Sequence, residues 1–162
     1  MLILWGIAIV VVLLFGATLL FGAPYLPTLK NSTNDALDLL DLKPGELLLE
    51  LGSGDGRLLR AAAKRGIRSI GYELNPLLVV YSKIVLWRYR KLATVKLANY
   101  WQVPLPKAQG IYVFLLQKYM QKLHTKIIND QLTPVKIVSN AFTIPNKKPV
   151  HINKGMHLYL YK

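Results

Sequence analysis

The chain has 162 residues and a mass of 18.3 kDa, which is enough for one ordinary domain. Because it contains no cysteine, disulfide bonds, thiolate metal sites and a cysteine nucleophile are excluded. The net charge of +13 lies in the second half, where fourteen basic residues and one acid, Asp130, follow Glu73. This asymmetry indicates an acidic partner (a membrane surface, a nucleic acid or an anionic protein face) or else a basic, well-solvated surface.

The N-terminal segment is apolar. No charged side chain precedes Lys30, and 22 of the first 29 residues are apolar. As a helix, residues 2–23 would reach about 33 Å, which is enough to cross the hydrocarbon core of a bilayer. A cleaved signal peptide would carry basic residues before the apolar run, and none is present. We therefore predict a retained, single-pass transmembrane helix over residues 1–23. Most Lys and Arg residues follow it, so the rest of the chain is expected on the cytoplasmic side.

Residues 24–30 contain two prolines, which fix φ and break a helix, so we expect a short connector there and one domain over residues 31–162. Strands and helices are expected to alternate between residues 46 and 139, which is typical of a parallel sheet with helices on both faces. The fold class is therefore α/β, with a Rossmann-like, doubly wound, mostly parallel sheet and a C-terminal antiparallel hairpin. In chain order we predict a helix over 31–42, a strand over 46–51, a helix over 57–64, a strand over 68–73, a helix over 76–91, strands over 94–98 and 111–116, a helix over 117–132, a strand over 135–139 and a hairpin over 150–161.

The most informative segment is residues 47–57, where an apolar strand runs into Gly-Ser-Gly-Asp-Gly and a helix begins. Glycines permit a tight turn and let a ligand approach the backbone, and the helix N-terminus offers free amide donors. The dinucleotide-binding fingerprint needs Gly or Ala three positions after its second glycine, but this chain has Arg57 there. The spacing also lacks the Lys-Ser/Thr pair of a P-loop. Such a turn is a weak signal by itself, so its meaning depends on the acids around it.

Two acidic residues accompany the turn. Glu50 lies just before it, and Glu73 ends the next predicted strand, 21 residues after Gly52. In a doubly wound sheet, an acid at the position of Glu73 sits in a surface crevice and accepts hydrogen bonds from ribose hydroxyls. A carboxylate at Glu50 can hold an ammonium group. S-adenosylmethionine, which has a ribose at one end and a cation at the other, fits this layout.

These motifs resemble those of class I, seven-stranded, S-adenosylmethionine-dependent methyltransferases. Glu-Leu-Gly-Ser-Gly-Asp-Gly-Arg from Glu50, Gly-Tyr-Glu-Leu-Asn-Pro from Gly71 and Pro-Tyr-Leu-Pro-Thr from Pro24 are similar to one small family within that class. It contains the membrane-anchored protein-lysine methyltransferases of the ATP synthase c subunit and the adenine nucleotide translocase. The resemblance implies S-adenosyl-L-methionine as cofactor and a lysine of a membrane-associated protein as substrate. The cofactor-binding residues that it implies are Glu50, Gly52, Ser53, Gly54, Asp55, Gly56, Glu73, Leu74, Asn75, Asn99 and Tyr100.

Two positions depart from the patterns of these relatives. Asn99 stands where the family usually has an Asp facing the adenine amino group, although an Asn oxygen can still accept that hydrogen bond. Gln117 stands where class relatives that methylate amines on bases often carry Asn-Pro-Pro. That absence argues against nucleobase methylation, and we do not expect nucleic acid as the substrate.

Methyl transfer to lysine needs a neutral amine, and burial in an apolar pocket lowers the pKa of lysine. No general base or other catalytic residue is assigned, and the three histidines lack the spacing of a metal site, so no metal is expected. The pocket walls that we consider, each of which could equally be ordinary core, are Tyr81, Trp101, Phe114 and Phe142.

Two other functions stay open. One is methylation of RNA or of a small amine, with the basic second half as the binding surface. The other is a non-catalytic, cofactor-binding assembly factor. Residues 87–91 interleave aromatic and basic side chains as nucleic-acid binders do, but they fit better as the basic end of a helix, where cations suit the helix dipole.

Overall fold

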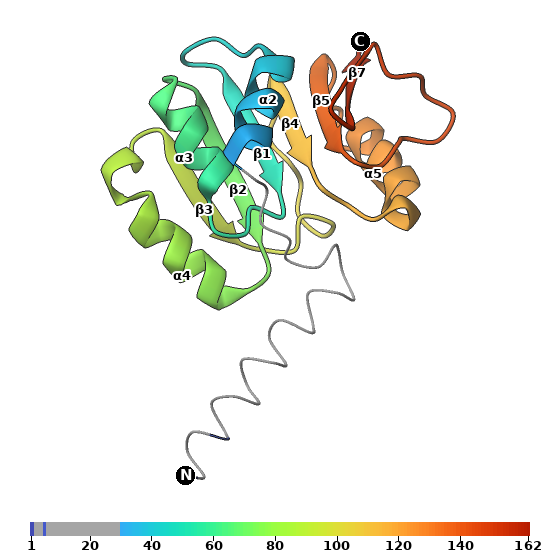
Figure 1. The fold of residues 1–162 in the computed structure, drawn as a ribbon. Helices are drawn as coiled ribbons and strands as arrows, with labels where there is room; N and C mark the ends of the chain where they lie inside the picture. The colour runs from blue at the N-terminus through green and yellow to red at the C-terminus, as the bar shows by residue number, and fades with distance from the viewer. Residues whose placement is uncertain (2–4, 6–29) are drawn as a thin grey trace.

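The computed structural model describes residues 30–162 together with Met1 and Trp5 (Figure 1). The predicted anchor over residues 1–23 and nearly all of the connector lie outside these residues. Within the described part of the chain, no helix has the length and apolar character needed to cross a membrane.

A seven-stranded sheet forms the centre of residues 30–162. Its order is β3-β2-β1-β4-β5-β7-β6; the first five strands in that order pair in parallel, and β7 pairs antiparallel with β5 and β6. The order reverses between β1 and β4, which makes the carboxyl ends of these strands the place where an open α/β sheet binds ligands. The strands are β1 (Leu47–Leu51), β2 (Arg68–Glu73), β3 (Ala93–Leu97), β4 (Gly110–Val113), β5 (Val135–Asn140), β6 (His151–Asn153) and β7 (Met156–Tyr161).

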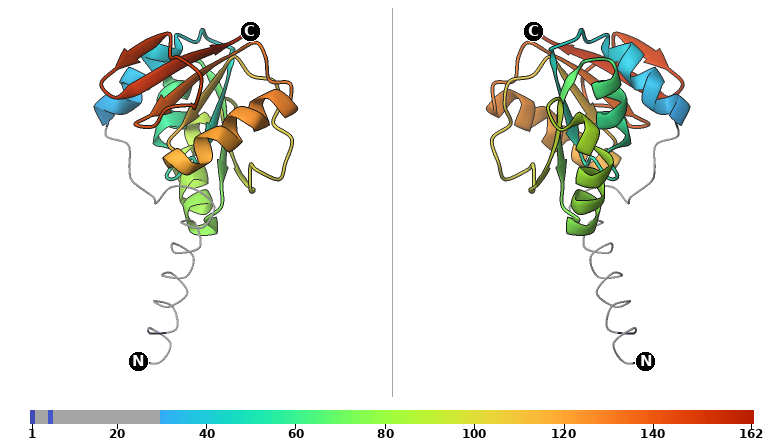
Figure 2. Two further views of the ribbon diagram at one scale, coloured as in Figure 1. Left: turned by 90° about the vertical axis from the view of Figure 1, so that its right-hand side faces the viewer. Right: turned by 90° about the vertical axis from the view of Figure 1, so that its left-hand side faces the viewer.

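Helices cover both faces of the sheet (Figure 2). One buried cluster joins Leu48 of β1 to Ala36 of α2 and Ala62 of α3, and another joins the neighbouring Leu49 to Leu123 of α5. Successive side chains of a strand point to opposite faces, so α5 lies on the other side of the sheet from α2 and α3. The doubly wound fold with its C-terminal hairpin is thus confirmed. The helices are α2 (Lys30–Leu40), α3 (Arg57–Lys64), α4 (Pro76–Val85) and α5 (Gln117–Asn129).

Four predicted elements end two or more residues early, and packing explains two of these ends. The helix predicted over residues 76–91 ends at Val85 and is followed by a 3-10 turn, Trp87–Tyr89, because Leu86 leaves helical geometry to pack into the core. The strand predicted over residues 111–116 ends at Val113. Val113 pairs with Leu51, and β1 then enters the glycine turn, so that β4 has no partner on this side beyond that point. The other elements begin and end within three residues of the predicted positions.

Helix α2 runs from the carboxyl edge of the parallel strands to their amino edge. At its middle, Asp35 accepts a hydrogen bond of 3.0 Å from Lys154, in the β6–β7 turn that lies beside the end of β5. At its end, the Leu40 carbonyl accepts a hydrogen bond of 2.8 Å from Lys136, near the start of β5. Lys30 therefore enters the domain on the edge where β1 and β2 end.

Candidate functional site

The glycine turn after β1 uses a backbone that only glycine adopts readily. The φ angles are 90° at Gly52, 53° at Gly54 and 75° at Gly56, all in the left-handed region. A Cβ built on Gly52 would meet nothing within 4 Å, so the backbone there faces open space. The alternating glycines are therefore required by conformation, and at Gly52 a ligand can come close to the main chain.

Glu73 holds this turn against the end of β2. Its Oε2 accepts a hydrogen bond of 2.8 Å from the Gly54 amide, and its Oε1 accepts hydrogen bonds of 2.9 and 2.8 Å from the amides of Leu74 and Asn75. Only 7% of Glu73 is exposed. The sequence predicted an acid in an open crevice; instead, the carboxylate is buried and uses three of its roughly four acceptor positions on the backbone.

Gly71 and Ser82 also contact the glycine turn, and neither was predicted to have a role there. A Cβ on Gly71 of β2 would lie 2.6 Å from the Ser53 side chain, so only glycine allows this approach. Ser82 of α4 is fully buried, and its hydroxyl donates a hydrogen bond of 2.8 Å to the Gly54 carbonyl. The signal for Ser82 was a small polar residue on the buried face of an otherwise apolar helix.

Glu50 is the polar group of this edge that most needs a partner. It is 6% exposed, and its Oε2 has no hydrogen-bond partner among the described residues. Burial, with the nearby carboxylates of Asp55 and Glu73, raises the pKa of Glu50 well above its usual value, and the Arg57 guanidinium offsets only part of this. A buried carboxylate is costly when unpaired, so the site fits a cationic group brought by a ligand.

The far side of the site is formed by the segments after β2 and β3. The Asn75 side chain accepts a hydrogen bond from the Leu77 amide and caps α4, while its buried Nδ2 has no partner among the described residues. The Asn99 side-chain oxygen accepts a hydrogen bond of 3.0 Å from the Trp101 amide. Burial and the nearby negative charge of Glu73 raise the pKa of Tyr100, which stays neutral.

The structure brings the eleven predicted site residues to one edge of the sheet, at the carboxyl ends of β1, β2 and β3. Their surroundings differ. Ser53 is buried and its hydroxyl has no partner among the described residues, whereas Asp55 accepts a hydrogen bond of 3.0 Å from the Arg57 Nε. The edge thus combines an open glycine backbone, a buried acid and two buried polar side-chain groups that have no hydrogen-bond partner within the part of the chain that the structure describes.

Comparison with known proteins agrees with this geometry. Residues 50–151 match the family model described as the ANTKMT methyltransferase domain. The chain belongs to this family. It is 34% identical over 132 residues to the adenine nucleotide translocase lysine N-methyltransferase of Mus musculus, and 31% identical over 131 residues to the Xenopus laevis lysine N-methyltransferase of the ATP synthase c subunit. Each match covers 80% of this chain but 57% and 58% of those proteins, so the chain spans a little over half their length.

A solved structure is also similar over nearly its whole length. It is the RNA methyltransferase of Salinibacter ruber in complex with S-adenosyl-L-homocysteine. The TM-score is 0.75 at 28% sequence identity, and the match covers 83% of this chain and 91% of that one. The resemblance to class I methyltransferases that the motifs indicated is therefore confirmed.

The residues predicted as walls of a substrate pocket in this family member do not all lie together. Trp101 and Phe142 are partly buried and pack against one core cluster. Tyr81 is instead 54% exposed on α4, where it lines a cavity together with Asp55 and Arg57 of the glycine turn, so its place as a wall stays a prediction. Gln117 exchanges two hydrogen bonds with the Thr143 backbone, of 3.0 and 3.2 Å, and so fixes the loop that carries Phe142.

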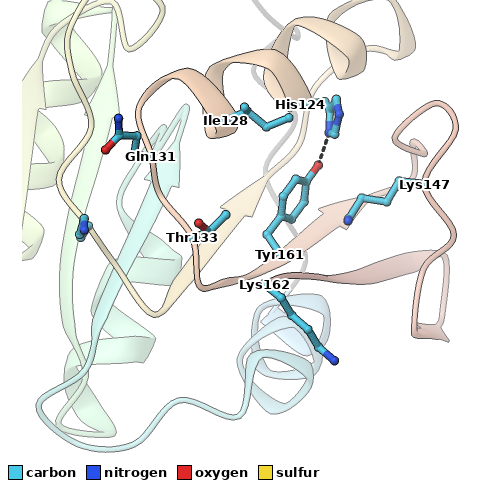
Figure 3. Close-up of a pocket in the computed structure, with 8 residues that line it drawn as sticks. His124, Ile128, Gln131, Thr133, Lys147, Tyr161 and Lys162 are labelled. Atoms are coloured by element: carbon cyan, nitrogen blue, oxygen red, sulfur yellow. Dashed lines mark hydrogen bonds between the residues drawn. The ribbon is translucent and has the colours of Figure 1, made fainter.

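A second cavity lies apart from the glycine turn. Figure 3 shows this space, of about 560 Å³, beside α5, the segment before β5 and the end of β7. His124 and Tyr161 form a hydrogen bond of 2.7 Å there, and the Lys147 Nζ lies 4.0 Å from the centre of the Tyr161 ring. These residues sit towards the amino ends of the parallel strands, so this cavity is separate from the candidate cofactor site.

Proposed function

We propose that this chain is an S-adenosylmethionine-dependent protein-lysine N-methyltransferase that acts on a membrane-associated protein. The observation that carries the proposal is Glu50, a buried carboxylate beside a turn of left-handed glycines, with one oxygen that has no hydrogen-bond partner in the described residues. This arrangement lies at the carboxyl edge of the sheet, next to the strands where the order reverses. The lysine N-methyltransferases among the relatives support lysine as the acceptor.

The chain offers suitable partners for each part of the cofactor. Glu50 would pair with the ammonium group, and the open backbone at Gly52 would lie along the methionine part. The remaining acceptor position of Glu73 would take a ribose hydroxyl. On the adenine side would stand the Asn99 oxygen, the Tyr100 ring and the Nδ2 of Asn75, which has no hydrogen-bond partner among the described residues. When bound, S-adenosylmethionine supplies an electrophilic methyl group.

The chain's own residues would present the lysine and keep it neutral. Apolar walls disfavour the charged ammonium, which lowers the pKa of an entering lysine and releases its proton to solvent. Trp101 and Phe142 are suited to this because they are aromatic and partly buried. Gln117 holds the Phe142 loop in place through its two hydrogen bonds to Thr143. Positioning of the amine would supply much of the rate.

We also propose a transmembrane anchor over residues 1–23, a connector over residues 24–30 and the methyltransferase domain over residues 31–162, on the cytoplasmic side. Support comes from the uncharged, apolar composition before Lys30 and from the entry of α2 at the carboxyl edge. Seven connector residues reach at most about 25 Å when fully extended. The candidate site would therefore stay close to the bilayer, where a membrane-associated substrate lies.

Methylation of RNA is the second candidate, because the similar Salinibacter ruber protein is an RNA methyltransferase and the second half of this chain is basic. Salt-sensitive RNA binding is expected of such a charge whatever the function, so binding does not discriminate.

The test is transfer of a labelled methyl group from S-adenosylmethionine by the full chain to a host membrane fraction. We expect label in material that protease degrades and nuclease does not, recovered as methyllysine after hydrolysis. Label that nuclease removes would replace this proposal with RNA methylation. Calorimetry that finds no S-adenosylmethionine binding would favour a non-catalytic role. The Glu50→Gln variant serves as the matched control with impaired cofactor binding.

A further inference from the structure

Helix α4 presents an apolar stripe to solvent. Leu77, Val80, Tyr81 and Ile84, with Trp87 of the following turn, are between 45% and 69% exposed. Their spacing of three or four residues places them along one helical face. We call these five residues the α4 stripe.

The fold does not need this stripe for its core. The opposite face of α4 packs inward through Val79, Ser82 and the adjoining Leu86, each at most 4% exposed. The other exposed large apolar side chains in residues 30–162 are fewer on any one element, namely Leu97, Ile128 and, on or beside the β6–β7 hairpin, Val150, Ile152 and Leu160. A contiguous exposed apolar surface marks an interaction site, so we expect the α4 stripe to be covered by a binding partner.

The surroundings of the stripe are uniformly basic. Between Leu74 and Lys91 the sequence contains no acid, and four cations lie along the stripe or just after it. The Arg90 guanidinium lies 4.6 Å from the centre of the Trp87 ring. A helix with Leu, Trp and Tyr on one face and Lys and Arg around it matches an interfacial helix on anionic lipid. The four cations are Lys83, Arg88, Arg90 and Lys91.

A basic cavity adjoins the stripe. It has a volume of about 620 Å³, lies among α2, α3 and α4, and shares Tyr81 with the stripe and Asp55 with the glycine turn. Two of its cations, Arg57 and Arg65, are paired with acids. The other two, Arg60 and Lys64, have no ion-pair partner among the described residues, so the cavity can accept a negatively charged group.

The position of the stripe favours a bilayer over other occupants. Helix α4 starts directly after β2, at the carboxyl edge, and Lys30 enters at that same edge with 29 residues free of charged side chains before it. We propose that the α4 stripe is a docking surface that lies on an anionic lipid bilayer, with phosphodiester headgroups in the adjoining basic cavity. This surface would hold the side of the domain that carries α4 against the membrane. The proposal rests on the membrane attachment proposed above but not on the methyl-transfer chemistry.

The absence of cysteine makes a site-directed probe straightforward. A nitroxide is attached to Ile84→Cys on the stripe and, as the matched control, to Ile128→Cys near the end of α5. Both isoleucines are more than half exposed, so labelling should leave the fold intact. The full chain is placed in vesicles of equal parts phosphatidylcholine and phosphatidylserine. The accessibility of each label to oxygen and to a polar nickel chelate is then measured.

We expect the ratio of oxygen to chelate accessibility to be on the order of tenfold higher at position 84 than at position 128, as for side chains buried several Å in the lipid interface. The ratio at position 84 should fall in vesicles of phosphatidylcholine alone, because the basic side chains then lose their anionic partners. Equal ratios at the two positions would overturn the docking surface, and no dependence on phosphatidylserine would overturn the headgroup cavity.

Other occupants give different signals, each of which would overturn the proposal. Immobilisation of the position-84 label in detergent without lipid would assign the stripe to the chain's own N-terminal segment. Dipolar broadening between labels would assign the stripe to contact with a second copy of the chain. A change in label accessibility on adding RNA, with no change on adding lipid, would assign the stripe to nucleic-acid binding. Vesicle flotation separates the proposed N-terminal anchor from the proposed α4 docking surface. If the protein floats with the vesicles but the label at position 84 stays exposed to water, only the docking surface is refuted. If the protein does not float, both proposals are refuted.

Discussion

The ends of β1 and β2 each carry one buried glutamate, and the two are treated in opposite ways by the fold. Glu73 accepts three backbone hydrogen bonds, whereas an oxygen of Glu50 has no partner in the described chain. Buried polar groups in folded proteins are almost always satisfied, and the cofactor ammonium proposed above would give the Glu50 oxygen its partner. Glu73 thus fixes the backbone of the turn through its hydrogen bonds, whereas Glu50 is the side chain proposed to bind the cationic group of the cofactor.

The largest expected effect comes from removing the satisfied acid. Glu73→Ala leaves three amides without an acceptor, and hydrogen bonds to a charged group contribute about 1.5–3 kcal/mol each. We expect the free energy of unfolding to fall by roughly 4 kcal/mol or more, with cofactor binding lost as a consequence. Chemical denaturation measures this. Glu46→Ala is the control, since Glu46 accepts a single hydrogen bond, from the Lys43 amide. A Glu73→Ala protein as stable as the control would show that the amides do not depend on Glu73.

Glu50→Gln should affect binding and stability in opposite directions. Loss of the charged partner should weaken S-adenosylmethionine binding about ten- to hundredfold. In the free protein the raised pKa of Glu50 means that the folded state holds its proton more tightly than the unfolded state. The stability of the wild type therefore falls, relative to the Gln variant, as pH rises from about 4.3 towards the raised pKa. We expect Glu50→Gln to be the more stable protein at neutral pH and the difference to disappear in acid.

The same shift predicts how binding depends on pH. The cofactor ammonium pairs with ionised Glu50, so the affinity of the wild type should increase with pH across that range, while that of Glu50→Gln stays flat. Calorimetric titrations at several pH values measure both proteins. Parallel profiles would assign the pH dependence to another group and remove Glu50 from the ammonium site.

Gly52 and Gly45 have nearly the same φ angle, so substituting each distinguishes the cost of backbone strain from an effect on cofactor binding. Gly52 and Gly45 have φ angles of 90° and 88°, and a Cβ on either meets nothing within 4 Å. Gly52→Ala and Gly45→Ala should each cost about 1–2 kcal/mol of stability. Only Gly52→Ala should also weaken cofactor binding, because its methyl group enters the space proposed for the ligand. Equal affinity of the two variants would move the cofactor away from Gly52.

The smallest effect is expected at Ser82. Ser82→Ala removes the hydrogen bond to the Gly54 carbonyl and should cost about 1 kcal/mol. Ser69→Ala is the control, because the Ser69 hydroxyl is buried with no partner among the described residues and its removal should be neutral or stabilising. Thermal unfolding of both variants tests this. If Ser69→Ala proves the more costly substitution, the Ser82 contact does not hold the turn.

Features that depend on neighbouring residues were predictable from the sequence. Asn75 caps α4 and Pro76 begins it, which is the order that these residue types prefer at the start of a helix. The glycine turn adopts left-handed φ angles at all three glycines. The alternation of strands and helices predicted the doubly wound sheet. The hairpin predicted over residues 150–161 is present as β6 and β7, which turn at Lys154-Gly155. These signals are readable because φ preferences, caps and turns act within a few residues.

Only the tertiary structure decided which polar groups have hydrogen-bond partners and which do not. The contacts that hold the turn join Gly54 to Glu73, 19 residues away, and to Ser82, 28 residues away. β4 ends at Val113 because β1 turns away, and Tyr81 faces solvent because Ser82 and Leu86 occupy the buried face of α4. A sequence specifies the chemistry of these side chains, but their burial and hydrogen bonding depend on how segments far apart in the chain pack against one another. That packing leaves Glu50 without a partner for its Oε2 among the described residues.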